Sequence, residues 1–380
     1  MSLAPEQTAS KKIASEQTAL ESTLAHLEAL VSFDTQNPPR AITVDSEIFA
    51  YLKQQLSGFA ITMFDAGEGC ISLLAVRGKP EILFNFHIDT VPVAPNWSVN
   101  PFTLIVDDKK ATAIGACDIK GAAACMLSAV AKTPGDVALL FSSDEEHGSS
   151  TAIKQFLTII DTVGDFKQVI VAEPTQAKAV LAHRGIMSAK GYFSGISGHA
   201  SEARAFKDSA IHKAGNWMSS ALQWVEQQTQ SVDSLSGLPF NIGKIDGGIK
   251  ANMIAADCEL AFGFRPLPGQ DAQQVLADLQ QLADCKLLGG FSGPTLPAAN
   301  QNFALAISNA NALAQSCHLP IGNAVNFWTE ASLFSQAGCT TLVFGPGNIA
   351  QAHTADEWVE LDQLTQVEAY YCQILNGSAS

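Results

Sequence analysis

Polar residues that can bind a metal or move a proton follow directly after several short apolar segments of this sequence. The segments are four or five residues long and apolar nearly throughout, as expected of strands buried on both faces. The segments and the polar residues after them are Ile82–Phe86 with His87 and Asp89, Val137–Phe141 with Glu145 and Glu146, Val169–Ala172 with Glu173, and Thr341–Phe344 with His353. A further acid, Asp118, opens a loop before the helical pattern that starts at Gly121.

These residue types in this arrangement predict a metal centre. In open α/β sheets ligands bind beyond the carboxyl ends of the strands, so the loops that carry these residues should converge. Converging carboxylates and imidazoles need a cation to offset their repulsion and lost solvation. Two histidines and three carboxylates suffice for two Zn²⁺ ions if one carboxylate bridges, and Co²⁺ or Mn²⁺ are possible substitutes. A single such residue would more often be a hydrogen-bonded histidine, a helix cap or a surface charge, but five after separate elements favour the metal.

The elements around these residues predict an α/β fold. Strand-like segments alternate with helical patterns such as Gly121–Lys132 and Ala152–Ile160, which is typical of a layered domain with a mostly parallel central sheet. An amphipathic helix is expected at Ala19–Val31, because its leucines recur at steps of three and four residues.

A middle segment has a different pattern and predicts a second domain. Strands at Ile186–Phe193, Phe240–Ile245 and Met253–Arg265 and helices at Ser209–Gln228 and Asp271–Ala283 are expected, an order typical of an inserted, ferredoxin-like α+β module. Gly289–Pro297 is interpreted as the return linker. The predicted division is a discontinuous catalytic domain at 1–182 and 291–380, with an inserted dimerisation domain at 183–290.

Composition narrows the class of partner. The 380 residues include 22 Lys and Arg against 37 Asp and Glu, a formal net charge of −15. Neither nucleic acid nor an anionic membrane suits such a balance, so a small molecule is the expected partner. Eight cysteines without a C-x-x-C pair, a polar start and the lack of a long apolar run predict a reduced, soluble, cytoplasmic protein.

The motifs that carry these residues resemble those of the dinuclear zinc amidohydrolases, a family that includes deacetylases, desuccinylases, aminoacylases and carboxypeptidases. The resemblance covers about Ser32 to Val359, and the segments that carry it are VSFDTQNPP (31–39), NFHIDTVP (85–92), GACDIKGAAA (115–124), SSDEEHGS (142–149), VAEPT (171–175) and GPGNIAQAHTADEWV (345–359).

The resemblance implies a role for each residue of the metal centre. His87 and Glu173 would bind one zinc, Glu146 and His353 the other, and Asp118 would bridge both. Asp89 would orient the imidazole of His87. Glu145 would be the general base, which takes a proton from the attacking water and passes it to the leaving amine. Glu at position 173 is typical of deacylases and carboxypeptidases, whereas Asp is usual there in di- and tripeptidases.

The resemblance also implies substrate contacts in the middle segment. His199, in GISGHAS (195–201), would reach across a homodimer and stabilise the oxyanion in the site of the other subunit. Arg265 would bind the substrate α-carboxylate through its planar fork, with Arg184 assisting. Asn252 would lie near the acyl carbonyl.

Within the family the chain is most similar to deacetylases of N-acetylornithine and N-acetylcitrulline, through NIGKIDGGIKANMIA, FRPLPG, NFWTEAS and IAQAHTADEW. The first substrate implies arginine biosynthesis and is the primary hypothesis, with acetylcitrulline and a desuccinylase activity as alternatives. The Ile-Lys-Ala segment at 249–251 is similar to the citrulline type, and Lys250 would disfavour the ammonium of ornithine. Rival hypotheses are an inactive metal-binding homologue, a two-metal phosphoesterase and a broad dipeptidase. The first would lack a ligand or the base, and the second would need a phosphate-binding loop.

Overall fold

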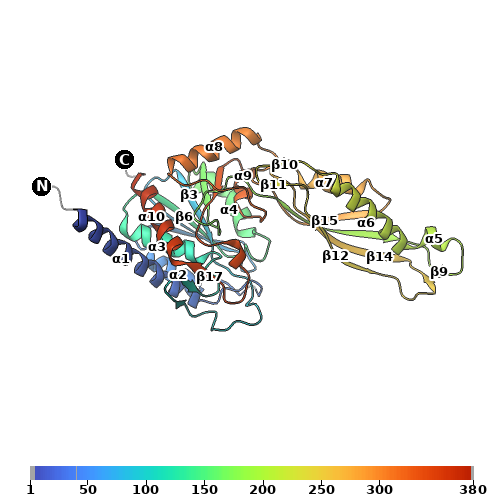
Figure 1. Cartoon of the computed structure of the whole chain (residues 1–380), viewed down its shortest axis with the longest axis horizontal. Coiled ribbons are helices and arrows are strands. Elements are labelled where there is room, and N and C mark those ends of the chain that lie inside the picture. The colour runs from blue at the N-terminus through green and yellow to red at the C-terminus, as the bar shows by residue number, and fades with distance from the viewer. Residues whose placement is uncertain (1–4, 40, 378–380) are drawn as a thin grey trace. The chain divides into compact units, whose positions relative to one another are not determined.

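The computed structural model describes residues 5–39 and 41–377 and divides into two compact units. Unit 1 comprises Met1–Leu181, Ser308–Gly322 and Thr329–Ser380, and unit 2 comprises Ala182–Ile307 and Asn323–Trp328. The first boundary falls next to the expected one at 182, whereas residues 291–307 and 323–328 join unit 2 instead of the catalytic unit. Figure 1 shows the elements of both units.

A six-stranded sheet forms the centre of unit 1, in the order β1-β2-β6-β3-β7-β16. β3 pairs in parallel with both β6 and β7, and β7 pairs in parallel with β16, while β2 is antiparallel to β1 and β6. The strands are β1 (Ala60–Asp65), β2 (Ile71–Arg77), β3 (Ile82–His87), β6 (Val137–Ser142), β7 (Gln168–Val171) and β16 (Thr340–Val343). The mostly parallel sheet is confirmed, and its four parallel strands place their carboxyl ends at one edge.

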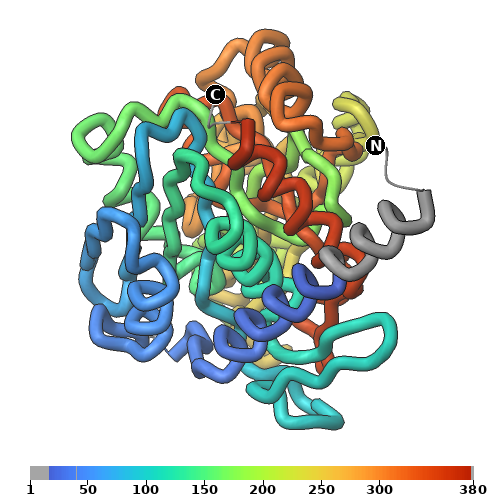
Figure 2. Tube along the Cα trace, turned by 90° about the vertical axis from the view of Figure 1, so that its left-hand side faces the viewer, coloured from blue at the N-terminus to red at the C-terminus, as the bar shows by residue number. Residues whose placement is uncertain are grey.

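Helices cover this sheet, and three of them pack against one another. The helices of unit 1 are α1 (Pro5–Ser32), α2 (Glu47–Gln55), α3 (Lys120–Lys132), α4 (Thr151–Val163), α9 (Ala331–Gln336), α10 (Leu361–Gly377) and the short 3-10 helix η1 (Ile349–Gln351), and α8 (Phe303–Ser316) is shared with unit 2. α1, α3 and α10 contact one another, as Figure 2 shows, while α4 and α9 pack on the sheet. Aromatic rings fill the core, with Phe86 stacked on Phe141 at 5.5 Å between centroids and Tyr371 edge-on to Phe84 at 5.6 Å.

A small antiparallel sheet brings two distant loops of unit 1 together. β5 (Lys110–Thr112) pairs with β4 (Ile105–Val106) on one side and with β17 (Trp358–Glu360) on the other. The chain runs from β5 to Asp118, and it passes His353 shortly before β17. The pairing of β5 with β17 therefore holds the loops of Asp118 and His353 side by side.

Unit 2 is a four-stranded antiparallel sheet with two helices, in the order β12-β14-β8-β15. Its main elements are β8 (Ile186–Ser194), α6 (Ala210–Glu226), β12 (Phe240–Gly247), β14 (Asp257–Phe264), α7 (Ala272–Gln280) and β15 (Lys286–Gly293). This β-α-β-β-α-β order confirms the ferredoxin-like module. Trp217 of α6 is fully buried against Phe262, 5.1 Å between ring centroids, and donates its indole N–H to the Leu279 carbonyl at 3.0 Å.

The expectation that a linker begins at Gly289 is wrong, because β15 pairs with β8 through Gly293 and supplies the fourth strand. Shorter elements complete the unit, namely β9 (Gly198–His199), α5 (Ala205–Asp208), β10 (Ser231–Val232), β11 (Leu235–Ser236) and β13 (Met253–Ile254).

All eight cysteines are free thiols. Among the described residues, no helix has both the length and the apolar character that crossing a bilayer requires.

Candidate metal centre

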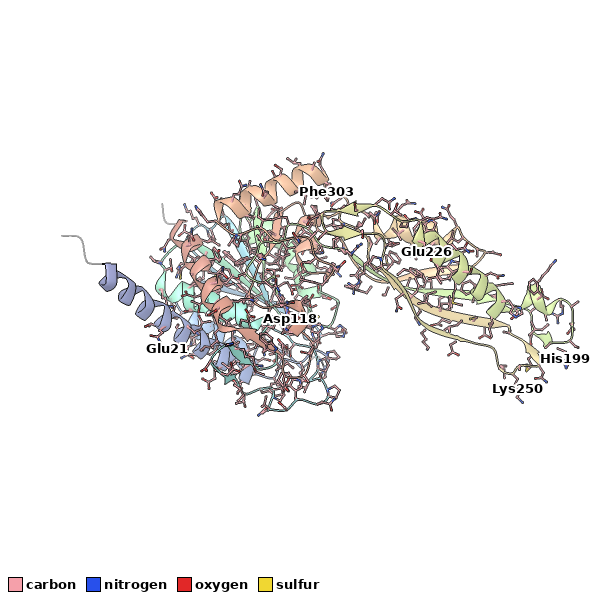
Figure 3. The ribbon with its side chains drawn as sticks, in the orientation of Figure 1. Glu21, Asp118, His199, Glu226, Lys250 and Phe303 are labelled. Atoms are coloured by element: carbon pink, nitrogen blue, oxygen red, sulfur yellow. The ribbon has the colours of Figure 1, made fainter. Side chains whose placement is uncertain are left out.

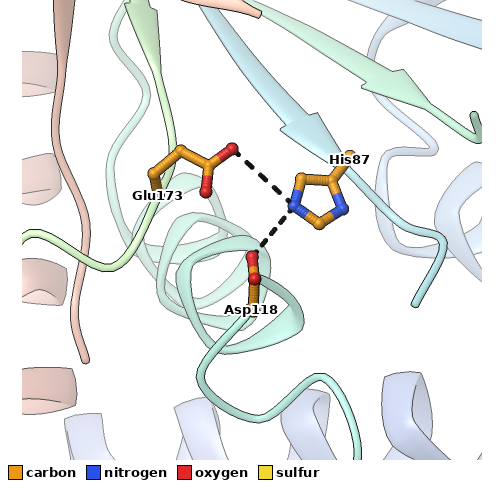
Figure 4. A group of neighbouring side chains, drawn as sticks. All are labelled: His87, Asp118 and Glu173. Carbon is orange, nitrogen blue, oxygen red and sulfur yellow. Dashed lines mark hydrogen bonds and ion pairs between the residues drawn. The ribbon is translucent and has the colours of Figure 1, made fainter. Parts of the chain in front are cut away.

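His87 ends β3 and lies at the centre of the first group of side chains. The imidazole is almost completely buried, and its Nε2 lies 3.1 Å from Oδ1 of Asp118 and 3.9 Å from Oε1 of Glu173. Figure 4 shows both carboxylates directed at this nitrogen. The other ring nitrogen, Nδ1, lies 3.1 Å from the backbone carbonyl of Asp89. Donation from Nδ1 to that carbonyl leaves Nε2 as the lone-pair nitrogen, which is the form that binds a metal.

A second group forms around His353. Its Nε2 lies 3.1 Å from Glu146 and 3.3 Å from Oδ2 of Asp118. The two oxygens of Asp118 therefore face different imidazoles, Oδ1 toward His87 and Oδ2 toward His353. A carboxylate placed in this way could be shared by two metal ions.

The donor atoms fit two metal ions. His87, Asp118 and Glu173 form one group, and Asp118, Glu146 and His353 form another, with the ligand atoms of each group within 4.8 Å of one another. All are nitrogen and carboxylate oxygen donors, which suit a borderline divalent cation. The structure brings together all five predicted metal ligands.

The protonation equilibria of these side chains also indicate a cation site. Burial raises the pKa of Glu173 well above its usual range, and the pKa of Glu146 is raised for the same reason. Hydrogen bonds to Asp118 and Glu146 raise the pKa of His353 to about 10. Burial therefore makes the charged forms of Glu146 and Glu173 costly, and a divalent cation would offset that cost.

Asp89 holds the acid pair rather than only the imidazole. Its carboxylate oxygen lies 3.7 Å from Nδ1 of His87, farther than its own carbonyl, whereas the carboxylate accepts the backbone N–H groups of Glu145 at 3.3 Å and Glu146 at 3.0 Å. These bonds fix the turn after β6, where Glu146 joins the group of His353. Burial raises the pKa of Glu145 well above its usual range.

Several buried residues support this centre and were missed by sequence reasoning. Asn37 donates to Asp89 at 3.3 Å and to the Ser143 carbonyl at 3.0 Å. Glu357 accepts the backbone N–H groups of Gly115, Cys117 and Asp118 at 3.1, 2.8 and 2.9 Å. These side chains lie in the motifs VSFDTQNPP and HTADEW, but only the structure shows their partners.

Glu330 and Lys120 are also buried among these elements. Ser142 donates to Glu330 at 3.1 Å, and burial raises the pKa of this carboxyl to about 8. The Lys120 ammonium, fully buried, donates to the Phe33 carbonyl at 3.1 Å.

The remaining candidates lie in unit 2, and three of them share one end of it. His199 of β9 pairs with Met253 of β13, and the Ala200 N–H donates to the Asn252 carbonyl at 3.1 Å. Lys250 lies in the preceding turn with its side chain exposed, and Figure 3 shows it near His199 at this end of the unit.

The two arginines differ in their partners. Arg184 is buried and donates to Asn326 and to the carbonyls of Gly237, Arg265 and Ser236 at 2.7–3.2 Å. These bonds hold Arg184 among segments of unit 2, and its assisting contact with the substrate carboxylate stays a prediction. The guanidinium of Arg265 has no hydrogen bond or ion pair with any residue in 5–39 or 41–377, and burial lowers its pKa. A half-buried, unpartnered guanidinium is suited to an anionic ligand.

Fold and site together define a metal-dependent amidohydrolase. A sequence model of peptidase family M20/M25/M40 matches residues 83–377. The chain belongs to this family.

Two similar proteins of assigned activity are deacetylases. An N-acetyl-L-citrulline deacetylase from Xanthomonas campestris is 50% identical over 367 residues, which cover 94% of this chain and 99% of that protein. An acetylornithine deacetylase from Edwardsiella ictaluri is 32% identical over 328 residues, 78% of this chain and 82% of that protein.

Solved structures share the fold at low identity. An aminopeptidase from Bacillus cereus superimposes with a TM-score of 0.71 at 17% identity, covering 95% of this chain and 99% of that chain. A dinuclear metal-binding peptidase of the M20 family from Bacillus subtilis gives 0.63 at 14% identity, covering 95% and 98%.

Proposed function

We propose that the chain hydrolyses the amide bond of an N-acetyl amino acid, with N-acetylcitrulline as the first candidate. The observation that carries the reaction type is the pair Glu145 and Glu146, held by Asp89 beside two groups of metal-ligand side chains. The deacetylase from Xanthomonas campestris, 50% identical over nearly its whole length, supports the substrate. The sequence alone placed N-acetylornithine first, and this degree of identity reverses the order.

Two Zn²⁺ ions are the proposed cofactors, with Co²⁺ or Mn²⁺ as substitutes. His87 and Glu173 would hold one ion and Glu146 and His353 the other, with Asp118 shared. When bound, such ions polarise the acyl carbonyl and lower the pKa of water.

Glu145 performs the proton transfers in this mechanism. Its raised pKa, caused by burial, suits a carboxylate that takes a proton from the attacking water and then protonates the leaving nitrogen. The hydrogen bonds from the backbone N–H groups of Glu145 and Glu146 to Asp89 hold the proposed base, Glu145, in a fixed position relative to the proposed ligand, Glu146. Asp89 thereby positions both acids during the reaction.

Unit 2 would supply the substrate contacts. Arg265 binds the α-carboxylate of the amino acid, for which its unpartnered guanidinium is suited. His199 acts from the other subunit of a homodimer and donates to the developing oxyanion, with Asn252 close to the acyl group. The enzyme would act in the cytoplasm, in a step of arginine biosynthesis.

N-acetylornithine is the second candidate, favoured by relatives such as the Edwardsiella ictaluri enzyme at 32% identity. Lys250 distinguishes the two substrates in this proposal. Its exposed ammonium lies in the turn next to Asn252 and would repel the side-chain ammonium of ornithine but not the neutral ureido group of citrulline.

A substrate panel tests this assignment. Metal-loaded enzyme should cleave N-acetylcitrulline with a higher kcat/KM than N-acetylornithine, N-succinyl-diaminopimelate or a dipeptide. Lys250→Glu should shift the preference toward N-acetylornithine, whereas Lys244→Glu, the same charge change in β12, should not. Cleavage of dipeptides without turnover of any N-acetyl amino acid would refute the proposal.

A further inference from the structure

His199 is held by hydrogen bonds on its backbone and on one ring nitrogen. Its N–H donates to Oε1 of Glu202 at 3.0 Å, and the N–H of the next residue, Ala200, donates to the Asn252 carbonyl. On the ring, Nδ1 lies 2.7 Å from the hydroxyl of Ser201 and 3.3 Å from the Ser201 backbone N–H. Among the described residues, Nε2 of His199 has no hydrogen-bond partner.

The Ser201 hydroxyl and backbone N–H together favour a proton on the other ring nitrogen, Nε2. A backbone N–H only donates, so it favours the form in which Nδ1 offers its lone pair. The Ser201 hydroxyl then donates to Nδ1 as well. With Nδ1 accepting, the single proton of the neutral imidazole lies on Nε2.

The loop around His199 is itself fixed by Arg204. This guanidinium donates to the carbonyls of Ile196 and Ser197 at 3.2 and 3.0 Å, and it pairs with Glu202 at 2.7 Å and with Asp208 at 2.9 Å. Glu202 therefore accepts from Arg204 and from the His199 backbone at the same time. The loop that Arg204 fixes also holds Ser201 beside the imidazole of His199.

We propose that Ser201 is a positioning residue that fixes neutral His199 in the Nε2–H tautomer, and so makes its free ring edge a hydrogen-bond donor. The catalytic consequence rests on the proposed function, in which His199 donates to the oxyanion of an amide substrate. In the opposite tautomer the exposed nitrogen would carry a lone pair, which repels an oxyanion. Ser201 thus determines whether His199 stabilises or opposes the transition state.

Nuclear magnetic resonance of histidine ring nitrogens tests the tautomer without reference to activity. The protein is labelled with ¹⁵N-histidine, metal-loaded and free of substrate, and is measured at about pH 8.5, where imidazoles are ordinarily neutral. The His199 signals are assigned by comparison with His199→Gln. The wild type should show a protonated Nε2 and an unprotonated Nδ1.

Two variants change the partner of Nδ1. Ser201→Ala removes the hydroxyl donor and should increase the Nδ1–H fraction. Ser201→Asp places an acceptor there and should make Nδ1–H the main form. Ser197→Ala, in the same loop, is the control and should keep the wild-type spectrum. Nδ1–H in the wild type, or an unchanged tautomer in both Ser201 variants, would overturn the proposal.

Kinetics separate this inference from the proposed function. With an N-acetyl amino acid as substrate, Ser201→Asp should lower kcat roughly 100-fold or more with little change in KM, as for loss of an oxyanion donor. A reversed tautomer with unchanged kcat would contradict the catalytic consequence. Failure of the wild type to cleave any N-acetyl amino acid would refute the proposed function, and the nitrogen spectra would still decide the tautomer.

Discussion

The two carboxylate oxygens of Asp118 face two different histidines. One carboxylate oxygen lies 3.1 Å from the imidazole of His87 and the other 3.3 Å from that of His353. Burial alone would raise the pKa of this carboxyl, but the two imidazoles lower it below its ordinary value. The acid therefore stays ionised between the two histidines, which the proposed bridging role requires.

Replacing Glu145 by glutamine should have a different effect from replacing its neighbour Glu146. Glu145→Gln should lower kcat about 10²–10⁴-fold and keep both metals, because it removes the base and leaves the ligands. Glu146→Gln should lose metal, because it removes a ligand at the His353 group. Elemental analysis and steady-state kinetics measure both effects. Near-normal kcat in Glu145→Gln would exclude it as the base.

His183 gives a prediction on stability against pH. Burial lowers its pKa from 6.5 to about 4. Below pH 6.5 the unfolded chain gains a proton here that the folded chain refuses until about pH 4, so stability falls as pH drops through this window. The loss is up to about 3 kcal/mol.

His183→Gln should lack this contribution, so its free energy of unfolding should decline less than that of the wild type between neutral and acidic pH. Urea unfolding at several pH values provides the measurement. His318→Gln, which replaces an exposed histidine, is the matched control. Parallel curves for His183→Gln and the wild type would contradict the assignment.

At the scale of elements, the polar residues at the carboxyl edge of the parallel sheet could be predicted because the pattern that indicates them is local in the sequence. Each apolar segment and the acid or histidine after it are consecutive in the sequence, and parallel strands bring their carboxyl ends together. The supporting contacts could not be predicted in this way. Asn37 and Ser143 are 106 residues apart, and no local pattern connects them.

The fourth strand of unit 2 was missed for a different reason. Its glycines at 289, 290 and 293 are typical of a turn, and its ladder with β8 is interrupted between Gly289 and Ser292. The strand exists because β8 offers an open edge, which is a tertiary effect.

The loop at 33–39 should position the catalytic turn through Asn37. Asn37→Ala removes the donor to Asp89 and to the Ser143 carbonyl, and it should lower kcat about 10–100-fold, as is usual for partners behind a metal site. Gln36→Ala is the control, because it loses the bond to the Val93 N–H at 2.7 Å but leaves Asp89 untouched. Equal losses of kcat in both variants would contradict this role of Asn37 and indicate that kcat depends only on the packing of the loop at 33–39.

At the scale of the whole molecule, the proposed chemistry is divided between the two units. The proposed metal ligands and Glu145 belong to unit 1, whereas His199, Asn252 and Arg265 belong to unit 2. His199 is predicted to act in the site of another subunit, and mixing variants tests this prediction.

Subunits carrying His199→Ala and subunits carrying Glu145→Gln should each be nearly inactive alone. In a heterodimer one site combines an intact Glu145 with an intact His199 of the partner subunit, so activity should return to about half of the wild-type value. Subunit exchange is verified by mass or by tag pull-down. No recovery in verified heterodimers would place His199 in the site of its own chain or outside catalysis.

The central claim, a metal-dependent deacetylase with two ions per site, is tested most directly by titrating metal into stripped protein. Chelation should abolish hydrolysis of N-acetylcitrulline, and Zn²⁺ or Co²⁺ should restore it, with binding complete at about two ions per chain, as expected when one carboxylate bridges a two-metal site. Full turnover by protein that elemental analysis finds free of metal would contradict the account.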